Sequence, residues 1–327
     1  MIPLSCPSCG GLLILSDEWY ECQRCSRLFG QTLGIPDLRD TRSRPSEEEA
    51  RLIERMCESY PTAEFADLLR LRFSNAPTTE PLLAYYMQYH LCLSERGRKM
   101  FNMFRAVLEA HLGQPERGLA LDLGCGMGTS TVGMAQIFDE VCGLDPSLPE
   151  LLLAKKYLET QGATNVILVQ GLGQHLSFPS ETFDYVNAQN VLEHVFDLEA
   201  VLSEVYRTLR QGGYFCGDSR NRFDLFLPES HVRLRWVGYW PRRWMGHYVR
   251  WRRGVDYEAT YLLSYAELRQ GLRRHFGPHQ RIVFPRVAAY GGPAWGDRAL
   301  SRIQAIPLLR EALLWVFPVH LALARRV

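Results

Sequence analysis

Four cysteines near the start of the chain have the spacing of metal ligands. Two residues separate Cys6 from Cys9 and Cys22 from Cys25, and twelve residues lie between the two pairs. Four thiolates in this arrangement can surround one zinc ion tetrahedrally and leave no position open for water or substrate. The spacing therefore predicts a structural zinc site. The total of nine cysteines is odd and no secretion signal precedes Cys6, so we expect a cytoplasmic protein without a disulfide framework.

A second group of residues with the types needed for ligand binding lies in the middle of the chain. Residues 119–123 are apolar enough for a short buried strand, and Gly124, Gly126 and Gly128 follow it at every second position. Glycine lets the backbone turn tightly and approach a ligand closely, so a strand, a glycine turn and a helix start make a nucleotide-sized site. The dinucleotide pattern G-x-G-x-x-G is excluded, because threonine occupies the third glycine position from either start.

Asp122 followed by the alternating glycines resembles motif I of the class I S-adenosylmethionine-dependent methyltransferases. Later segments resemble this family in the same order, at residues 141–145, 166–170, 182–188, 190–195 and 211–216. The resemblance implies an α/β fold with a Rossmann-like seven-stranded sheet whose last strand is antiparallel. It also implies S-adenosylmethionine as the cofactor. A Rossmann-like sheet without this cofactor is the alternative.

The resemblance further implies which residues hold the cofactor. Asp145 ends the second predicted strand, where the family holds both ribose hydroxyls, and a carboxylate can accept both of their protons. Leu172 stands where the family commonly has an acid for the adenine amino group, so we expect backbone groups, Gln174 or apolar contact to hold the adenine. The expected cofactor-binding residues are Asp122, Gly124, Cys125, Gly126, Gly128, Asp145, Pro146, Leu172, Gly173, Gln174, Asn187 and Asn190.

His194 is the candidate for a general base, since an imidazole titrates near neutral pH. Capping or packing at a helix start is the alternative for this side chain. The pair Glu193-His194 resembles the end of the magnesium-binding pattern E-x-x-E-H found in a subset of methyltransferases. Asn190 stands where the first glutamate of that pattern would be, so we expect no catalytic metal.

An insertion is expected after the fifth predicted strand, at residues 218–254. Between His231 and Gly254 there are seven arginines, four tryptophans and no acid. Arginine binds phosphate or carboxylate and tryptophan offers a flat apolar wall, so we predict that the insertion lies over the acceptor site, with Arg242 and Arg243 binding the substrate. A solvated basic loop with tryptophans packed on the core is the alternative. Three tyrosines of a predicted helix are further substrate candidates, with ordinary helix packing as their alternative: Tyr85, Tyr86 and Tyr89.

The elements that must position these residues follow from apolar spacing and from the resemblance. Helices are predicted at residues 47–58, 63–73, 81–112 (with a break near Gly97), 129–138, 198–209 and 264–276, and the closing antiparallel pair of strands at 280–284 and 319–324. The expected domains are a zinc ribbon at 1–40, a linker and helical connector at 41–112, and a methyltransferase domain at 113–327. The ribbon resembles the small Trm112-like zinc ribbons and those that precede some rRNA guanine methyltransferases.

Composition limits the function only in part. The net charge of +1 over 327 residues gives no overall signature for nucleic acid or membrane. Prolines and charged residues interrupt the apolar stretch near residue 310, so we expect no transmembrane segment, although peripheral membrane contact stays open. The expected function is methyl transfer to a small or lipid-linked metabolite. The alternatives are an RNA methyltransferase that uses the ribbon for recognition and a non-catalytic partner protein. These residues indicate neither the acceptor atom nor the oligomeric state.

Overall fold

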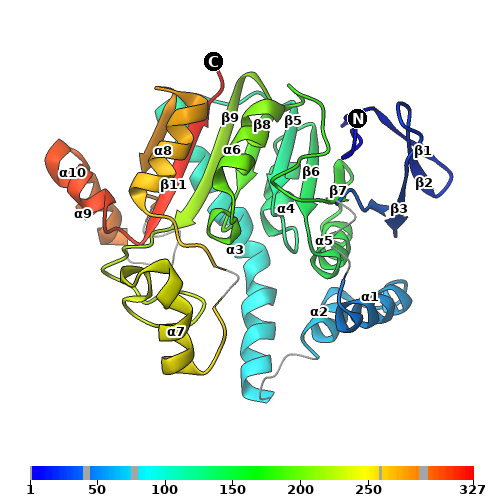
Figure 1. Cartoon of the computed structure of the whole chain (residues 1–327), viewed down its shortest axis with the longest axis horizontal. Coiled ribbons are helices and arrows are strands. Elements are labelled where there is room, and N and C mark those ends of the chain that lie inside the picture. Colours follow the sequence, from blue (N-terminus) through cyan, green and yellow to red (C-terminus); the bar gives the residue numbers. More distant parts are fainter. Residues whose placement is uncertain (1, 40–44, 75–79, 258–259, 287–293) are drawn as a thin grey trace. The chain divides into compact units, whose positions relative to one another are not determined.

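A mixed seven-stranded sheet is the main element of the chain (Figure 1). The structure is a computed structural model that describes residues 2–39, 45–74, 80–257, 260–286 and 294–327. The strand order is β10-β11-β9-β8-β5-β6-β7. The strands are β5 (Leu119–Leu123), β6 (Glu140–Asp145), β7 (Val166–Gln170), β8 (Phe183–Ala188), β9 (Leu209–Arg220), β10 (Gln280–Val283) and β11 (Val319–Arg325).

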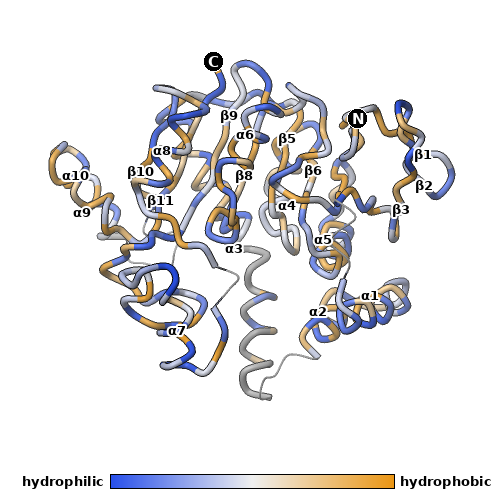
Figure 2. Tube along the Cα trace, in the orientation of Figure 1, coloured by the Kyte–Doolittle hydropathy of each residue, from blue (hydrophilic) through white to orange (hydrophobic). Residues whose placement is uncertain are grey.

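The direction of the strands confirms the predicted fold class. β5, β6 and β7 run parallel to one another, with Leu119 opposite Glu140 and Asp145 opposite Gln170. β11 is antiparallel to both of its neighbours, β9 and β10. All of β8 is buried, and so are most residues of β5 and β6. β5 is mainly apolar, as the hydropathy colouring of Figure 2 shows, and burial along a whole strand is typical of strands that are covered on both faces.

The chain divides into two compact units. The first unit comprises residues 1–102, 116–186 and 207–210, and the second comprises residues 103–115, 187–206 and 211–327. Helix α3 (Glu80–Leu112) contributes to both.

The first unit contains the four-stranded antiparallel ribbon and the parallel half of the sheet. Its elements outside the sheet are β1 (Leu13–Ser16), β2 (Trp19–Cys22), β3 (Leu28–Thr32), β4 (Ile35–Pro36), α1 (Glu47–Ser59), α2 (Phe65–Phe73), α4 (Thr129–Ala135) and α5 (Leu148–Thr160). Buried residues of α1, α2 and α5, such as Met56, Leu68 and Leu152, share one apolar core. The ribbon bonds to the segment that includes β7, through Leu38 N–H to Gln170 O (2.8 Å).

The predicted break near Gly97 is wrong, because α3 is continuous from Glu80 to Leu112. A Cβ atom at Gly97 would lie 2.5 Å from Cβ of Thr129. The glycine therefore lets α3 approach the start of α4 closely, and it does so without ending the helix.

The second unit contains η1 (Leu192–His194), α6 (Leu198–Thr208), η2 (Val237–Tyr239), α7 (Arg242–Arg253), α8 (Tyr265–Phe276), α9 (Ala294–Gln304) and α10 (Pro307–Leu314) beside its strands. The fifth strand of the sheet, β9, is longer than predicted and runs through Arg220, with Asp218 opposite Leu321 of β11. The insertion therefore begins after Arg220, not at Asp218. It has a small core of its own, formed by Leu234, Val237, Met245 and Val249.

The two last helices had no counterpart in the sequence analysis. Pro307, which reads as an interruption of an apolar stretch, occupies the first turn of α10. A proline is well accommodated there, because the amide it lacks has no partner in the first turn of a helix. Within the described residues, none of the helices combines the length and the apolar character that crossing a membrane requires.

Candidate functional site

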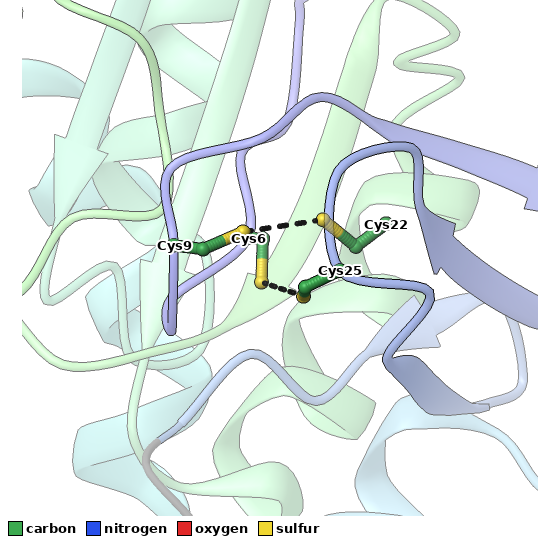
Figure 3. Close-up of side chains that lie close together, drawn as sticks. All are labelled: Cys6, Cys9, Cys22 and Cys25. Atoms are coloured by element: carbon green, nitrogen blue, oxygen red, sulfur yellow. Dashed lines mark hydrogen bonds between the residues drawn. The ribbon is translucent and has the colours of Figure 1, made fainter.

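The four cysteines of the ribbon lie in two turns that are built alike (Figure 3). Ser8 N–H donates to Cys6 Sγ and Arg24 N–H donates to Cys22 Sγ, each at 3.4 Å. The fourth residue after the first cysteine of each pair has a positive φ, 71° at Gly10 and 55° at Ser26. Each turn thus directs two sulfur atoms to one side.

The four sulfur atoms meet at one point and lie within 4.8 Å of one another. Sγ of Cys6 is 3.8 Å from that of Cys25, and Sγ of Cys9 is 3.5 Å from that of Cys22. Zinc–sulfur bonds of about 2.3 Å in a tetrahedron place the sulfur atoms about 3.8 Å apart, so the arrangement fits a zinc ion. No other group of three or more histidines, cysteines or carboxylates converges in this way among the residues that the structure describes.

The pKa values of Cys9 and Cys22 are shifted in opposite directions. Burial disfavours the Cys22 thiolate, but the amides of Arg24 and Cys25 and two neighbouring thiols lower the Cys22 pKa to about 6. The Gly11 amide favours the Cys9 thiolate, yet burial and the other three thiols raise the Cys9 pKa to about 12. Four thiolates at this point therefore need a cation among them, as a zinc site provides.

In the first unit, the turn after β5 presents backbone toward the end of β6. Gly124, Gly126 and Gly128 all have positive φ (66°, 49° and 76°), which only glycine adopts without strain. Gly126 N–H donates to Asp145 Oδ2 at 3.0 Å, and Ser147 N–H donates to Asp145 Oδ1 at 2.9 Å. A Cβ atom on Gly126 would meet no atom within 4 Å. Open space therefore lies directly beside a bare backbone amide and a carboxyl group.

The Asp145 carboxyl is buried, and burial raises its pKa to about 6. The amides of Ser147 and Gly126 counter this rise, while the nearby charges of Glu150 and Asp122 add to it. The group is therefore held by two backbone donors at the end of a strand, in a place where its charge is poorly solvated.

Asp122 and Cys125 support the same turn from inside. Asp122 is 1% exposed, and its Oδ2 accepts a hydrogen bond from Thr131 Oγ1 at 2.6 Å. This bond ties the end of β5 to the first turn of α4. Cys125 is buried, with Sγ placed 3.0 Å from where a Cβ on Gly143 would lie.

The remaining cofactor candidates fall in three places. Pro146 O accepts hydrogen bonds from Gln170 Nε2 (3.0 Å) and from an Arg39 guanidinium nitrogen (3.4 Å). Leu172, Gly173 and Gln174 form a turn after β7 that His175 N–H closes on Leu172 O at 3.1 Å. Pro146 follows β6 and this turn follows β7, just as the glycine turn follows β5, and the three strands are neighbours in the sheet. Asn187, which is buried, and Asn190, whose N–H donates to Asp218 Oδ1 at 2.7 Å, belong to the second unit.

The second unit holds a group of titratable side chains, of which the sequence had indicated only Glu193 and His194. Glu193 is buried, and its Oε2 has no hydrogen-bond partner in the described part of the chain. Burial, and next the charge of Asp218, raise the Glu193 pKa to about 7, while His231 and Arg220 counter the rise. A carboxyl with such a pKa can take up or release a proton near neutral pH.

His231 connects this group to the exposed His194. Its Nδ1 shares a hydrogen bond with Glu229 Oε1, and this bond raises the His231 pKa. The rings of His194 and His231 meet edge to face, with centroids 5.0 Å apart. The only sequence signal was the pair Glu193-His194, because nothing in the sequence links it to residues 229–231.

The structure separates the two arginines proposed for the substrate. One guanidinium nitrogen of Arg242 donates to Leu262 O at 2.9 Å, and another donates to Glu267 Oε1 at 2.7 Å. The central guanidinium carbon, Cζ, lies 3.7 Å from the centroid of the Tyr261 ring. Arg243 is exposed. Tyr85, Tyr86 and Tyr89 fall within α3, but their side chains lie outside the described residues.

Comparisons with known proteins identify several chains that are similar to this one. Residues 121–217 match the model of a methyltransferase domain. The sterol 24-C-methyltransferase erg6 of Aspergillus fumigatus is 29% identical over 47% of this chain and 42% of its own length. The ubiquinone biosynthesis O-methyltransferase of Azorhizobium caulinodans is 29% identical over 43% of this chain and 59% of its own. The solved structure of YcgJ from Bacillus subtilis is 18% identical, with a TM-score of 0.44, over 69% of this chain and 98% of that one.

The matched region contains the glycine turn after β5, the paired Asp145, most of β5 and the strands β6 to β8 of the sheet. Residues 121–217 are therefore similar to a methyltransferase domain, which supports the resemblance to the class I S-adenosylmethionine-dependent methyltransferases. The chain spans about half the length of the curated relatives that it matches.

Proposed function

We propose that the chain transfers a methyl group from S-adenosylmethionine to a small or lipid-linked metabolite. The observation that carries the proposal is the pairing of Gly126 with Asp145. A bare backbone amide with open space beside it, next to a carboxyl at the end of the neighbouring strand, fits a cofactor that has two ribose hydroxyls and an extended amino-acid end.

The residues of the first unit would bind and orient this cofactor. The Asp145 carboxylate would accept the hydroxyl protons, and the glycine turn would admit the ligand close to the backbone. Asp122 would keep the turn in place through Thr131. The cofactor supplies an electrophilic methyl group on a sulfonium ion. Transfer of such a group depends mainly on alignment and on exclusion of water, so the chain needs rigid positioning more than acid–base chemistry.

The acceptor class rests on the names of the relatives. One relative is a sterol methyltransferase and another acts in ubiquinone biosynthesis. Both names indicate lipid-like acceptors, which supports a small or lipid-linked metabolite over RNA. If the acceptor must lose a proton, Glu193 is the group in the second unit whose burial and pKa suit that task.

We also infer that Cys6, Cys9, Cys22 and Cys25 hold one zinc ion with a structural role. The ribbon is too small to bury enough apolar surface by itself, and four closed ligands leave no place for chemistry. The expected domain boundaries at residues 40 and 112 stay a prediction.

The test is a methyl-transfer assay with S-adenosylmethionine labelled in the methyl group. The full chain is incubated separately with a total lipid extract and with total RNA from bacterial cells, and the Gly126→Val variant is the control. We expect label in the organic phase with the parent and none with the variant. Label confined to RNA would overturn the acceptor class, and absence of S-adenosylmethionine binding by calorimetry would overturn the activity.

A further inference from the structure

The outer face of α7 carries two of the most exposed tryptophans in the described chain. Trp244 is 52% exposed and Trp251 is 75% exposed, whereas Met245 and Val249 on the same helix are 5% and 0% exposed. Residues seven apart lie almost above one another on a helix. Trp244 and Trp251 therefore share one line along α7, on the side opposite the one that packs into the core of the insertion.

Aromatic contacts turn this line into a continuous surface, the aromatic ridge, formed by Trp240, Trp244, Tyr248 and Trp251. Trp240 stacks on Trp244 (6.5 Å, 16°) and on Tyr248 (5.4 Å, 25°), and Tyr248 meets Trp251 at 6.3 Å. The Tyr248 hydroxyl donates to Arg235 O at 3.2 Å, which fixes the ridge to the insertion. The ridge is therefore an ordered apolar surface and not a set of separate exposed rings.

Arginines flank the aromatic ridge on both sides. At about 100° per residue, Arg243 and Arg250 fall on one side of the tryptophan line and Arg252 on the other. Arg250 pairs with Asp256, but within the described residues no carboxylate lies within ion-pair distance of Arg243 or Arg252. No acid occurs between His231 and Gly254, and Arg242 and Arg250 pair with acids outside this range, Glu267 and Asp256. Arg243 and Arg252 therefore add positive charge beside the aromatic ridge, although the whole chain carries only +1.

We propose that the aromatic ridge and its flanking arginines dock α7 on the surface of an anionic lipid membrane. Tryptophan prefers the boundary between headgroups and acyl chains, and arginine is attracted to anionic headgroups. A helix with one buried face, a basic outer face and outward aromatic rings has the composition of interfacial helices. RNA is less well matched, because base stacking needs free ring faces and Trp240 already stacks against two neighbours.

A membrane surface would supply the lipid-linked acceptor of the proposed function, on which this inference rests in part. Vesicle binding can nevertheless be tested without catalysis. The full chain is sedimented with vesicles of phosphatidylcholine, with and without phosphatidylglycerol. We expect binding to the anionic vesicles that weakens as salt is raised, together with a blue shift of tryptophan emission. Failure of methyl transfer with intact vesicle binding would concern only the proposed function.

Two double variants separate charge from ring insertion. Arg243→Gln with Arg252→Gln should weaken binding to the anionic vesicles by roughly 30-fold, from the usual contribution of two arginines near such a surface. Trp244→Ser with Trp251→Ser should abolish the emission shift. The matched control is Trp295→Ser with Arg273→Gln, because these exposed residues lie on α9 and α8, and it should bind like the parent. Calorimetry with S-adenosylmethionine checks that each variant is folded.

Three outcomes would overturn the proposal. One is equal binding, or none, to vesicles with and without phosphatidylglycerol. Another is a control variant that loses as much binding as the α7 variants. The third is displacement of the protein from vesicles by an RNA homopolymer at low concentration, which would assign the surface to nucleic acid.

Discussion

Gly126 and Asp145 are joined by a hydrogen bond from the glycine amide to Oδ2 of the carboxylate, at 3.0 Å. The bond links the turn after β5 to the end of β6, two strands that are neighbours in the sheet. It also leaves the carboxylate with unused acceptor capacity, since each oxygen has two lone pairs and each receives one backbone donor.

Removal of this carboxylate should weaken cofactor binding. We expect Asp145→Ala to reduce the affinity for S-adenosylmethionine by roughly 1–3 kcal/mol, the scale for loss of charged hydrogen bonds. Gly126→Val should abolish binding, because a side chain would enter the open space beside the turn and strain a backbone with φ of 49°. Calorimetric titration measures both effects. If both variants bind like the parent, the assignment of the cofactor site is wrong.

The raised Asp145 pKa gives the site a pH dependence with a defined sign. The pKa moves from 3.8 to about 6 on folding, so the protonated form is favoured in the folded chain, and this group's contribution to stability is lost as the pH rises from about 4 to about 6. Cofactor binding needs the charged carboxylate, so the affinity for the cofactor should increase as the pH rises. The affinity should fall about tenfold per pH unit below pH ~6, by linkage to one proton.

Titrations at several pH values check this expectation. Asp145→Asn, which cannot ionise, is the control and should bind weakly with no such pH dependence. A parent affinity that stays constant between pH ~5 and ~7 would contradict the raised pKa.

The ribbon should depend on its metal. The purified chain is expected to carry one zinc ion, and Cys22→Ser should lose it and destabilise residues 1–40, because a three-cysteine site is no longer closed. Most of the apolar core beside the sheet comes from elements outside the ribbon, with Ile35 as a buried contribution from β4, so the sheet should stay folded. Metal analysis and hydrogen exchange by mass spectrometry measure the two effects, with Cys57→Ser in α1 as the control.

Two outcomes would correct this picture. A chain purified without chelators that contains no zinc would contradict the metal assignment. A sheet that exchanges together with the ribbon would show that the bonds from Leu38 to Gln170 O and from Ser5 to Ser177 O make them one cooperative unit.

Much of the sheet could be predicted from the sequence, because its signals are local. The apolar runs at residues 119–123 and 166–170 coincide with β5 and β7. Local signals also misled. A glycine within a helical pattern often marks a break. Gly97 instead permits a close approach of α3 to Thr129, and the residues next to it in the sequence do not indicate this contact. Pro307 reads as an interruption but begins a helix.

The group around Glu193 could not be predicted for a different reason. Its members come from separate segments, and only the tertiary structure sets the distance between Glu193 and His231. The raised pKa of Glu193 follows from burial and from Asp218, and neither is visible in the sequence. For the same reason the sequence favours His194, whose residue type alone suits acid–base chemistry near neutral pH.

The roles of Glu193 and His194 can be told apart by their pH profiles. If Glu193 accepts a proton from the acceptor, Glu193→Gln should lower turnover and remove the decrease in rate below pH ~7, while leaving S-adenosylmethionine affinity unchanged. His194→Gln should keep that decrease. Methyl transfer to the lipid extract, followed across pH, is the measurement. Loss of the decrease in the His194 variant alone would assign the base to His194.

Arg242 and Arg243 are neighbours in sequence but should behave differently when each is changed to glutamine. Arg242→Gln removes the bonds to Leu262 O and Glu267 and the contact with the Tyr261 ring, so we expect a loss of roughly 1–3 kcal/mol in the free energy of unfolding. Arg243→Gln should leave stability unchanged, since its side chain is exposed. Its effect should appear as a higher concentration of lipid extract needed for half-maximal methyl transfer, at constant cofactor affinity.

Urea unfolding and the labelled-methyl assay measure these two quantities on the same preparations. Arg273→Gln is the control for removal of one exposed arginine, because it lies on α8, outside the insertion. If the Arg243 variant transfers methyl groups like the parent, Arg243 is an exposed surface residue without a role in acceptor binding. An Arg242 variant with parental stability and impaired transfer would instead show that its guanidinium leaves Glu267 to bind the acceptor, as the sequence alone predicted.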